Sequence, residues 1–441
     1  MTVYANAYVV TMDDHATEHA GGWLRVEDGL VAEVGNGPMP EGERIDLRGA
    51  VVTPGLVNTH HHLHQGLTRG RAADADLLTW LEELYPVWAR IDAEAEYAAA
   101  RAGLAELALS GCSTVFDHHY VFPRGVAGLV EAAIQAAREL GVRIVAGRGS
   151  MDLGRSNGGL TPDELTEDVD AILADTEALA VLHEPGPGAW TQIAVAPSSP
   201  FSVTKRLMFE SAELARRLGL RLHTHLAETV GEEEYCRGIF GCRPIEYLEQ
   251  VGWLADDVWC AHCVHLGADD AAALGRARTG VAHCPTSNLR LGAGVAPVRA
   301  LLDAGAPVGL GVDGSGSNER PDLAFEAKQA LLVARGAGGP SALTPREALR
   351  LATRGGAEVL GRSDLGSLEA GKAADFAVWP TDGAAFAGTD DPVAALVLGA
   401  PHRVGRLVVG GDEVVHDGRL VGADEDALVR ALHDHAARIA A

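Results

Sequence analysis

Four of the seven residues in the stretch THHHLHQ, residues 59–65, are histidines. The residues before them, GLVN, form an apolar run typical of a buried strand. Because alternate side chains of a strand share a face, His60 and His62 point to one side and His61 to the other. Two imidazoles on one side can bind a transition metal. The spacing predicts that His60 and His62 are metal ligands and that His61 is structural and faces the surrounding helices.

A catalytic zinc needs nitrogen or oxygen ligands beyond two histidines. Two later apolar runs end in such residues, since HTHLAE supplies His225 and GLGVD supplies Asp313. Each run is predicted to be a separate strand, so the ligands come from distant parts of the chain. The predicted metal set is His60, His62, His225 and Asp313.

These runs belong to a repeated pattern in which short apolar stretches alternate with Ala/Leu/Glu-rich stretches of helical period, as in βα units. Each run turns polar at its C-terminal end, which is the active-site face of a (β/α)8 barrel. We therefore predict an α/β fold, a (β/α)8 TIM barrel over residues 53–364, with helices at 93–111 and 127–141 that end in glycine. The eight predicted strands are residues 55–62, 112–119, 142–150, 191–199, 221–228, 258–266, 280–288 and 307–315.

The two ends of the chain have a different texture, with short alternating strands separated by Gly-containing turns. A two-stranded hairpin is only marginally stable alone, so we expect the N-terminal strands to pair with the C-terminal ones. The sequence predicts a small β-sandwich domain built from residues 1–52 and 365–441, with a terminal helix in the second part.

The chain of 441 residues carries a formal charge of −25, from 36 Lys plus Arg and 61 Asp plus Glu. No basic run interrupts this acidity, which argues against nucleic acids and anionic membranes as partners and favours a small-molecule substrate. The sequence shows no secretory signal pattern and no apolar run of about 18 residues, so a cytoplasmic location is expected. Its six cysteines are widely spread and are predicted to be reduced.

The chain resembles the amidohydrolase superfamily, in the branch that contains guanine, cytosine and adenosylhomocysteine deaminases and triazine hydrolases. The similarity spans essentially the whole chain and rests on PGLVNTHHH, HTHLAET, AHCVHL, VAHCPTSNLRLGAG, GLGVDG and GSLEAGKAADFAVW. It implies one divalent metal ion per chain, Zn2+ or alternatively Fe2+, and a homo-oligomer, expected to be a dimer. Binuclear members bridge two metals with a lysine from the fourth strand. The fourth run here, TQIAVAPSSPF, offers none, so a bridged second metal is not expected.

Residues and resemblance together support hydrolytic deamination as a hypothesis. The metal activates water, Asp313 accepts a proton as the water attacks a ring carbon bearing an amino group, and Glu228 protonates the neighbouring ring nitrogen. Glu228 follows His225 by three residues, where the strand gives way to its loop. In related deaminases the equivalent of His262 supports the attacked centre. The predicted catalytic residues are Glu228, His262 and Asp313.

Three stretches, residues 60–70, 148–165 and 232–253, are similar to 8-oxoguanine deaminases and their relatives. They imply an aminopurine or pterin substrate, with 8-oxoguanine first. Relatives usually carry an aromatic residue in place of His64 and a larger one in place of Gly66, and both positions lie beside the expected pocket. His64 is therefore expected to shape the pocket rather than to hold zinc. The predicted substrate-binding residues are Gln65, whose amide can pair with a lactam edge, Arg148, Glu228, His262 and His283.

Several alternatives stay open at the level of the sequence. A triazine-type hydrolase that expels chloride or an alkylamine would use the same metal ligands, and so would an adenosylhomocysteine- or cytosine-type deaminase. An amidase or cyclic-imide hydrolase is disfavoured by the missing lysine. A non-catalytic binding protein on the same fold is disfavoured because all four predicted ligands are kept.

Overall fold

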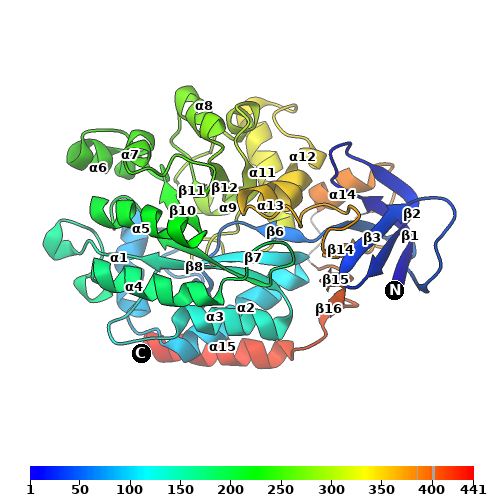
Figure 1. Ribbon diagram of the computed structural model, residues 1–441, viewed down its shortest axis with the longest axis horizontal. Coiled ribbons are helices and arrows are strands. Elements are labelled where there is room, and N and C mark those ends of the chain that lie inside the picture. The colour runs from blue at the N-terminus through cyan, green and yellow to red at the C-terminus, as the bar shows by residue number, and fades with distance from the viewer. Residues whose placement is uncertain (385, 400–402) are drawn as a thin grey trace.

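The computed structural model of the chain describes residues 1–384, 386–399 and 403–441. At its centre, eight parallel strands close into a barrel, each paired with its neighbour in chain order and the last with the first. The eight predicted apolar runs all contain barrel strands, which confirms the TIM barrel (Figure 1). The strands are β6 (Leu56–Asn58), β7 (Cys112–His119), β8 (Arg143–Ser150), β9 (Thr191–Pro197), β10 (Arg221–Leu226), β11 (Val258–His262), β12 (Gly280–His283) and β13 (Val308–Leu310).

The first and last barrel strands are the shortest, because β6 ends at Asn58 and β13 ends at Leu310. His60, His62 and Asp313 therefore follow their strands, whereas the sequence predicts them inside the strand runs. The chain nevertheless stays paired beyond β6, since the N–H of Asp313 donates to the carbonyl of His60 at 3.0 Å. His62 has extended dihedral angles, φ −133° and ψ 92°. The alternation of faces that the sequence argument uses thus continues past the end of the strand.

Helices surround the barrel (Figure 1). The two predicted helices are α2 (Ala93–Leu109) and α3 (Leu129–Leu140). Gly141 directly follows α3 and caps it, with a φ of 72° in the left-handed conformation that favours glycine after a helix. The short helix η1 (Leu63–Thr68) directly follows the histidine stretch. The other barrel helices are α1 (Leu77–Trp88), α4 (Val169–Leu179), α5 (Lys205–Leu218), α6 (Val230–Phe240), α7 (Pro244–Gln250), α8 (Ala268–Ala277), α9 (Pro285–Arg290), α10 (Val298–Asp303), α11 (Leu323–Gly338), α12 (Pro345–Arg350) and α13 (Gly356–Val359).

Both chain ends contribute strands to one continuous nine-stranded sheet beside the barrel, which confirms the predicted β domain (Figure 1). β5 and β14 join the two halves by antiparallel pairing. The domain boundary proposed between residues 52 and 53 falls within β5. The strands are β1 (Thr2–Val10), β2 (Glu18–Glu27), β3 (Leu30–Gly35), β4 (Glu43–Asp46), β5 (Val51–Pro54), β14 (Phe376–Trp379), β15 (Arg406–Val409), β16 (Asp412–His416) and β17 (Arg419–Leu420).

The predicted terminal helix is α15 (Glu425–Ala440), and it packs against the barrel rather than the sheet. It lies along α2 and contacts η1, and the Arg438 guanidinium pairs with Asp92 at 2.7 Å. A second helix of the C-terminal part, α14 (Pro392–Gly399), contacts α11 and α12. Within the described residues, no helix is both long enough and apolar enough to cross a bilayer.

Candidate metal centre and active site

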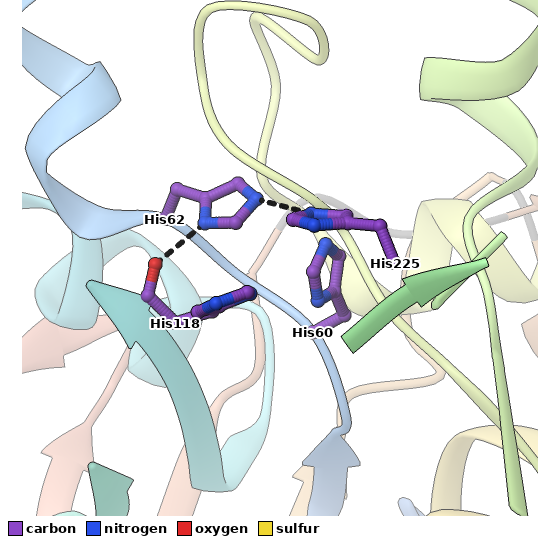
Figure 2. A group of neighbouring side chains, drawn as sticks. All are labelled: His60, His62, His118 and His225. Carbon is purple, nitrogen blue, oxygen red and sulfur yellow. Dashed lines mark hydrogen bonds between the residues drawn. The ribbon is translucent and has the colours of Figure 1, made fainter. Parts of the chain in front are cut away.

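Residues from distant parts of the sequence converge at the C-terminal ends of the barrel strands. His60 and His62 follow β6, His225 lies in β10 and Asp313 follows β13. Figure 2 shows His60, His62 and His225 gathered in one place, beside His118 from β7. The structure therefore brings together the four residues that the sequence predicts as ligands.

Hydrogen bonds decide which ring nitrogen of each histidine is free. His62 Nδ1 lies 2.7 Å from the His118 carbonyl oxygen, and His225 Nδ1 lies 2.6 Å from the Ser198 carbonyl oxygen. A carbonyl oxygen can only accept, so both Nδ1 atoms carry the proton and both Nε2 atoms keep a lone pair. Metal-binding histidines are commonly held in this way.

A relay of two histidines has the same effect on His60. His223 Nδ1 lies 3.0 Å from the Trp259 carbonyl oxygen and must donate to it, which leaves His223 Nε2 as an acceptor. His60 Nδ1 donates to that nitrogen at 3.0 Å, so His60 Nε2 also keeps a lone pair. Sequence reasoning missed His223 as a site residue. The available signal was the HTH spacing, which places His223 on the same face of the strand as His225.

The donor atoms are spaced as a single metal ion requires. His62 Nε2 lies 3.2 Å from His225 Nε2 and 3.3 Å from Asp313 Oδ1, and His60 Nε2 lies 3.4 Å from the same oxygen. A tetrahedral ion with bonds of roughly 2.0–2.1 Å holds its donors about 3.3–3.4 Å apart. Two nitrogen lone pairs at 3.2 Å would repel each other without a cation between them. These residues therefore fit a divalent metal ion.

Electrostatics keep the donor set ready to bind a cation. Burial lowers the pKa of His60 to about 3 and lowers the pKa of His225 well below its ordinary value, so both rings stay neutral. Hydrogen bonds from the N–H of Gly314 at 2.8 Å and the hydroxyl of Ser317 at 3.1 Å stabilise the Asp313 carboxylate in its charged form. Asp313 Oδ2 accepts a hydrogen bond from the Ser287 hydroxyl at 2.6 Å, which helps to orient the carboxylate.

His118 is a second histidine that sequence reasoning missed at this site. Its ring nitrogen lies within 4.8 Å of ligand atoms of His60, His62 and His225. His118 Nε2 donates to the Ala196 carbonyl at 2.8 Å, so the buried Nδ1 holds a lone pair and has no partner. The ring stacks on His225 with centroids 4.9 Å apart. His118 therefore supports the position of His225 from behind.

Glu228 and His262 form a buried acid–base pair beside the metal donors. His262 Nε2 lies 3.7 Å from Glu228 Oε2 and 4.0 Å from Asp313 Oδ2. Burial raises the pKa of Glu228 above its ordinary value, although the nearby His262 opposes the shift. Burial lowers the pKa of His262, but the charges of Glu228 and Asp313 outweigh it and raise the pKa overall. The two raised pKa values favour a proton that is shared within this pair.

Two residues that sequence reasoning missed hold this pair in place. The Glu232 carboxylate accepts the N–H of Ala227 at 2.8 Å and the N–H of Glu228 at 3.1 Å, which fixes the loop after β10. The Asn288 side-chain oxygen lies 2.9 Å from His262 Nδ1, which leaves His262 Nε2 facing Glu228. Glu232 stands in an EEE run that is typical of an exposed helix surface, so no local signal marks it.

A pocket opens over these groups, and α1 covers it. Gln65, a predicted substrate contact, lines the pocket. Its amide nitrogen lies 3.3 Å from the Tyr120 hydroxyl, and among the described residues its buried Oε1 has no hydrogen-bond partner. The α1 residues that line the pocket lie three or four positions apart, as residues on one face of a helix do. The lining residues are His62, Gln65, Leu77, Trp80, Leu81, Tyr85, Tyr120, Ser198, Ser199, Phe201, His225, Glu228, His262, Leu291, Asp313 and Ser317.

Comparison with known proteins identifies the family of the chain. The model of the amidohydrolase family matches residues 51–414. The chain belongs to the amidohydrolase family. It is 48% identical over 417 residues to an 8-oxoguanine deaminase of Pseudomonas aeruginosa, with 93% of each chain covered. It is 39% identical over 410 residues to an isoxanthopterin deaminase of an unknown prokaryotic organism, covering 88% of this chain and 85% of the relative.

A solved amidohydrolase-fold structure covers nearly the whole molecule. This structure, an atrazine chlorohydrolase from Arthrobacter aurescens TC1 complexed with zinc, aligns with a TM-score of 0.95 and 34% identity, over 99% of this chain and 100% of that chain. Fold and family are therefore settled together, and the position of the site at the C-terminal barrel face is the one expected for this barrel.

Arg148 does not contact the pocket, contrary to the expectation for this amidohydrolase. Arg148 lies near the C-terminal end of β8, and the residue is 2% exposed. Two acids bind its guanidinium, with Nη2 2.7 Å from Glu167 and Nε 2.8 Å from Asp175. Its guanidinium also lies 3.9 Å from the centre of the Phe122 ring. Because these partners already bind the guanidinium, Arg148 has a structural role rather than the predicted contact with the substrate.

His283 and His61, the remaining predicted residues, lie near the amidohydrolase site, as do two further basic side chains, His265 and Lys205. His283 ends β12 and is buried, but it does not line the pocket. His61 is buried on the helix side, where its Nε2 lies close to Gly103 of α2, as the alternation predicts. His265 contacts the Ala293 carbonyl at 2.9 Å outside the pocket. Lys205 begins α5 and contacts Gln250, away from the metal donors.

Proposed function

We propose that this chain is a metal-dependent hydrolytic deaminase of an aminated N-heterocycle. The observation that carries the proposal is the buried Glu228–His262 pair, which faces the pocket directly beside three histidine lone pairs and Asp313. A buried carboxyl group that can pass a proton to the ring is what expulsion of ammonia from a ring requires. The 48% identity to an 8-oxoguanine deaminase over nearly the whole chain supports the same reaction class.

His60, His62, His225 and Asp313 would hold the metal. When bound, the ion supplies Lewis acidity that lets water attack near neutral pH. Asp313 is ionised and lies at the edge of the pocket, so it accepts a proton from the attacking water. Glu228 then donates a proton to the ring nitrogen next to the attacked carbon, and His262 donates toward the oxygen added to that carbon. A C–O bond forms and the C–N bond to the amino group breaks. The proton held by Asp313 passes to the leaving amino group, which departs as ammonia, and the proton left on the added oxygen returns to Glu228 as the ring carbonyl forms.

A planar bicyclic substrate suits the lining of the pocket. Trp80, Tyr120 and Phe201 offer aromatic surface to a heteroaromatic ring. Gln65 offers an amide oxygen that has no hydrogen-bond partner in the described parts of the chain. A lactam N–H of an oxidised purine or pterin can pair with that oxygen. We therefore propose 8-oxoguanine or a similar aminopurine or pterin as the substrate class.

A triazine-type hydrolase is the second candidate. It is favoured by the TM-score of 0.95 with an atrazine chlorohydrolase, which shows that this fold accommodates a smaller, single-ring substrate. Adenosylhomocysteine- or cytosine-type deamination is a further member of the same reaction class. Release of chloride rather than ammonia would separate the triazine alternative from the proposal.

The test is ammonia release by the purified chain on a panel of guanine, 8-oxoguanine, isoxanthopterin, cytosine, adenosylhomocysteine and hydroxylated triazines, with chloride release from a chlorotriazine measured in parallel. We expect turnover of an aminopurine or pterin that is lost after chelation and restored by Zn2+. Full turnover by metal-free protein would contradict the metal role. Activity on the chlorotriazine alone would reverse the order of the two candidates.

We propose zinc as the physiological metal, because three imidazoles and a carboxylate suit it, with iron as the alternative. We also propose that the chain acts on a free small molecule and binds neither nucleic acid nor anionic membrane, on the basis of its acidic charge of −25. A homodimer, which the family resemblance implies, and a cytoplasmic location complete the proposal. Metal analysis of the purified protein and light scattering of its solutions test these assignments.

A further inference from the structure

A second cluster of metal-ligating side chains lies behind the active site. His64, Glu96 and His119 each offer one ligand atom, and these atoms lie within 4.8 Å of one another. They come from three elements, since His64 lies in η1, Glu96 in the first turn of α2 and His119 at the end of β7. Their relative exposures are 0%, 0% and 1%, so all three side chains are buried.

Most of the polar atoms in this cluster have no hydrogen-bond partner. Within the part of the chain that the structure describes, both ring nitrogens of His64, both carboxylate oxygens of Glu96 and Nδ1 of His119 are buried without a hydrogen-bond partner. Such atoms are rare in folded proteins because each costs its full desolvation free energy. The cluster therefore gathers five buried atoms that can bind a cation.

The tautomer of His119 directs a lone pair toward Glu96. His119 Nε2 lies 2.8 Å from the Val121 carbonyl oxygen and must donate to it, so in a neutral ring Nδ1 is unprotonated. That nitrogen lies 3.5 Å from Glu96 Oε2, which is longer than a good hydrogen bond. A lone pair facing a carboxylate at this distance matches two ligands of one cation, as in the active site, where the donors lie 3.2 to 3.4 Å apart.

The buried carboxylates of the cluster also favour a bound cation. Glu96 is fully buried, and among the described residues its recorded ion-pair partner is His119 rather than a lysine or arginine. Asp117 adds a second buried carboxylate nearby, whose Oδ1 accepts the N–H of Leu63 at 2.9 Å. Isolated buried carboxylates are strongly unfavourable unless they are paired or coordinate a metal.

We propose that His64, Glu96 and His119 form a second metal site, which binds a divalent transition metal such as Zn2+ and has a structural role. Two imidazoles and one carboxylate are a ligand set that zinc and iron accept. The site adds to the single ion per chain that the sequence predicts, and it needs no bridging lysine because it shares no ligand with the first site.

This second site would hold the rear wall of the substrate pocket. His64 precedes Gln65 and His119 precedes Tyr120, and both of those neighbours line the pocket. The His64 ring lies 6.0 Å from the His62 ring and 5.2 Å from the Tyr120 ring. A metal that ties η1, α2 and β7 together therefore fixes Gln65 and Tyr120 from behind.

The test counts metal in the full-length protein, independently of any activity. The chain is stripped with a chelator, saturated with Zn2+, desalted and analysed by mass spectrometry of metals. We expect two zinc ions per chain for the wild type and one for His64→Phe, which keeps the ring but removes both donors. His265→Phe is the matched control, because it removes a histidine outside both sites, and we expect it to keep two.

One zinc per saturated wild-type chain would overturn the proposal, and so would two in His64→Phe. If His64→Phe does not fold, anomalous diffraction at the zinc edge from wild-type crystals decides the question. A peak between His64, Glu96 and His119 supports the site, whereas occupation of the first site alone, or a water in the second, overturns it. Failure of the deaminase proposal would leave either metal count unchanged.

Discussion

At the scale of single residues, the site depends on which proton sits on which atom. Carbonyl groups fix the proton on Nδ1 of His62 and His225, and His223 fixes it on Nδ1 of His60. Glu228 is held by Glu232 and raised in pKa by burial. Each of these details depends on a neighbour distant in sequence, so substitution of the neighbour should affect the chemistry.

Replacement of Glu228 by Gln tests the proton donor. The amide keeps the shape of the side chain but cannot transfer a proton, so kcat should fall by about 10²- to 10⁴-fold while zinc content stays unchanged. Ammonia release and metal analysis measure the two effects. Glu234→Gln on the exposed face of α6 is the control and should retain activity. Equal activity of both variants would remove Glu228 from the mechanism.

Replacement of His223 by Phe tests the relay to His60. Without the acceptor at 3.0 Å, His60 is free to rotate or change tautomer, so zinc affinity should fall by roughly 10- to 100-fold. Competition with a chromogenic chelator measures the affinity, and His265→Phe is again the control. Unchanged affinity would show that burial alone orients His60.

Protonation of a buried neutral histidine should weaken the fold in acid. Burial lowers the pKa of His283 from 6.5 to about 3. Because the unfolded chain binds the proton more tightly, the contribution of neutral His283 to stability is fully present above pH 6.5 and is lost as the pH falls toward 3. The Tm of the wild type should therefore drop more between pH 7.5 and 5.5 than that of His283→Phe. Parallel decreases in the two proteins would assign the acid sensitivity to other groups.

At the scale of elements, short strands and strained loops aim the side chains. Ala227, His262 and Asp313 have φ values of 50°, 70° and 58°, in the left-handed region that non-glycine residues rarely adopt. All three stand at or just beyond the end of a barrel strand. These unfavourable backbone conformations redirect the chain at the points where Glu228, His262 and Asp313 must face the pocket.

The loop after β13 also sets the position of Gln65. A Cβ placed on Gly314 would collide with Gln65 Oε1, the flexible end of that side chain. Gly314→Ala should therefore displace Gln65 without preventing folding and raise KM by about 2- to 10-fold, the value of one hydrogen bond. Gly336→Ala on α11, where a Cβ meets open space, is the control. Steady-state kinetics on the preferred aminoheterocycle decide, and an unchanged KM would exclude a contact from Gln65.

At the scale of the whole molecule, a buried ion pair joins the barrel to the end sheet. Arg143 begins β8, and its guanidinium makes two bonds to Asp375 just before β14, at 2.8 and 3.1 Å. Both side chains are buried, so removal of one leaves the other uncompensated. The two parts of the chain are therefore coupled in stability.

Asp375→Ala should destabilise the protein by about 3–5 kcal/mol, because it leaves the Arg143 charge buried and unpaired. Thermal unfolding should show a lower Tm, and Asp412→Ala at an exposed position of β16 should not. A Tm equal to that of the wild type would mean that water replaces the carboxylate at this junction.

The sequence alone determined the barrel, the pairing of the two chain ends and the four ligand candidates, because periodicity and the polar ends of apolar runs are local properties. It also separated His61 from His60 and His62 by strand alternation. Only the tertiary structure revealed His223, His118 and Glu232 in the site, removed Arg148 from it, and brought His64 together with Glu96 and His119. The physical reason is that hydrogen-bond partners and buried charges arise between segments far apart in the chain, and no local pattern records which segments will meet.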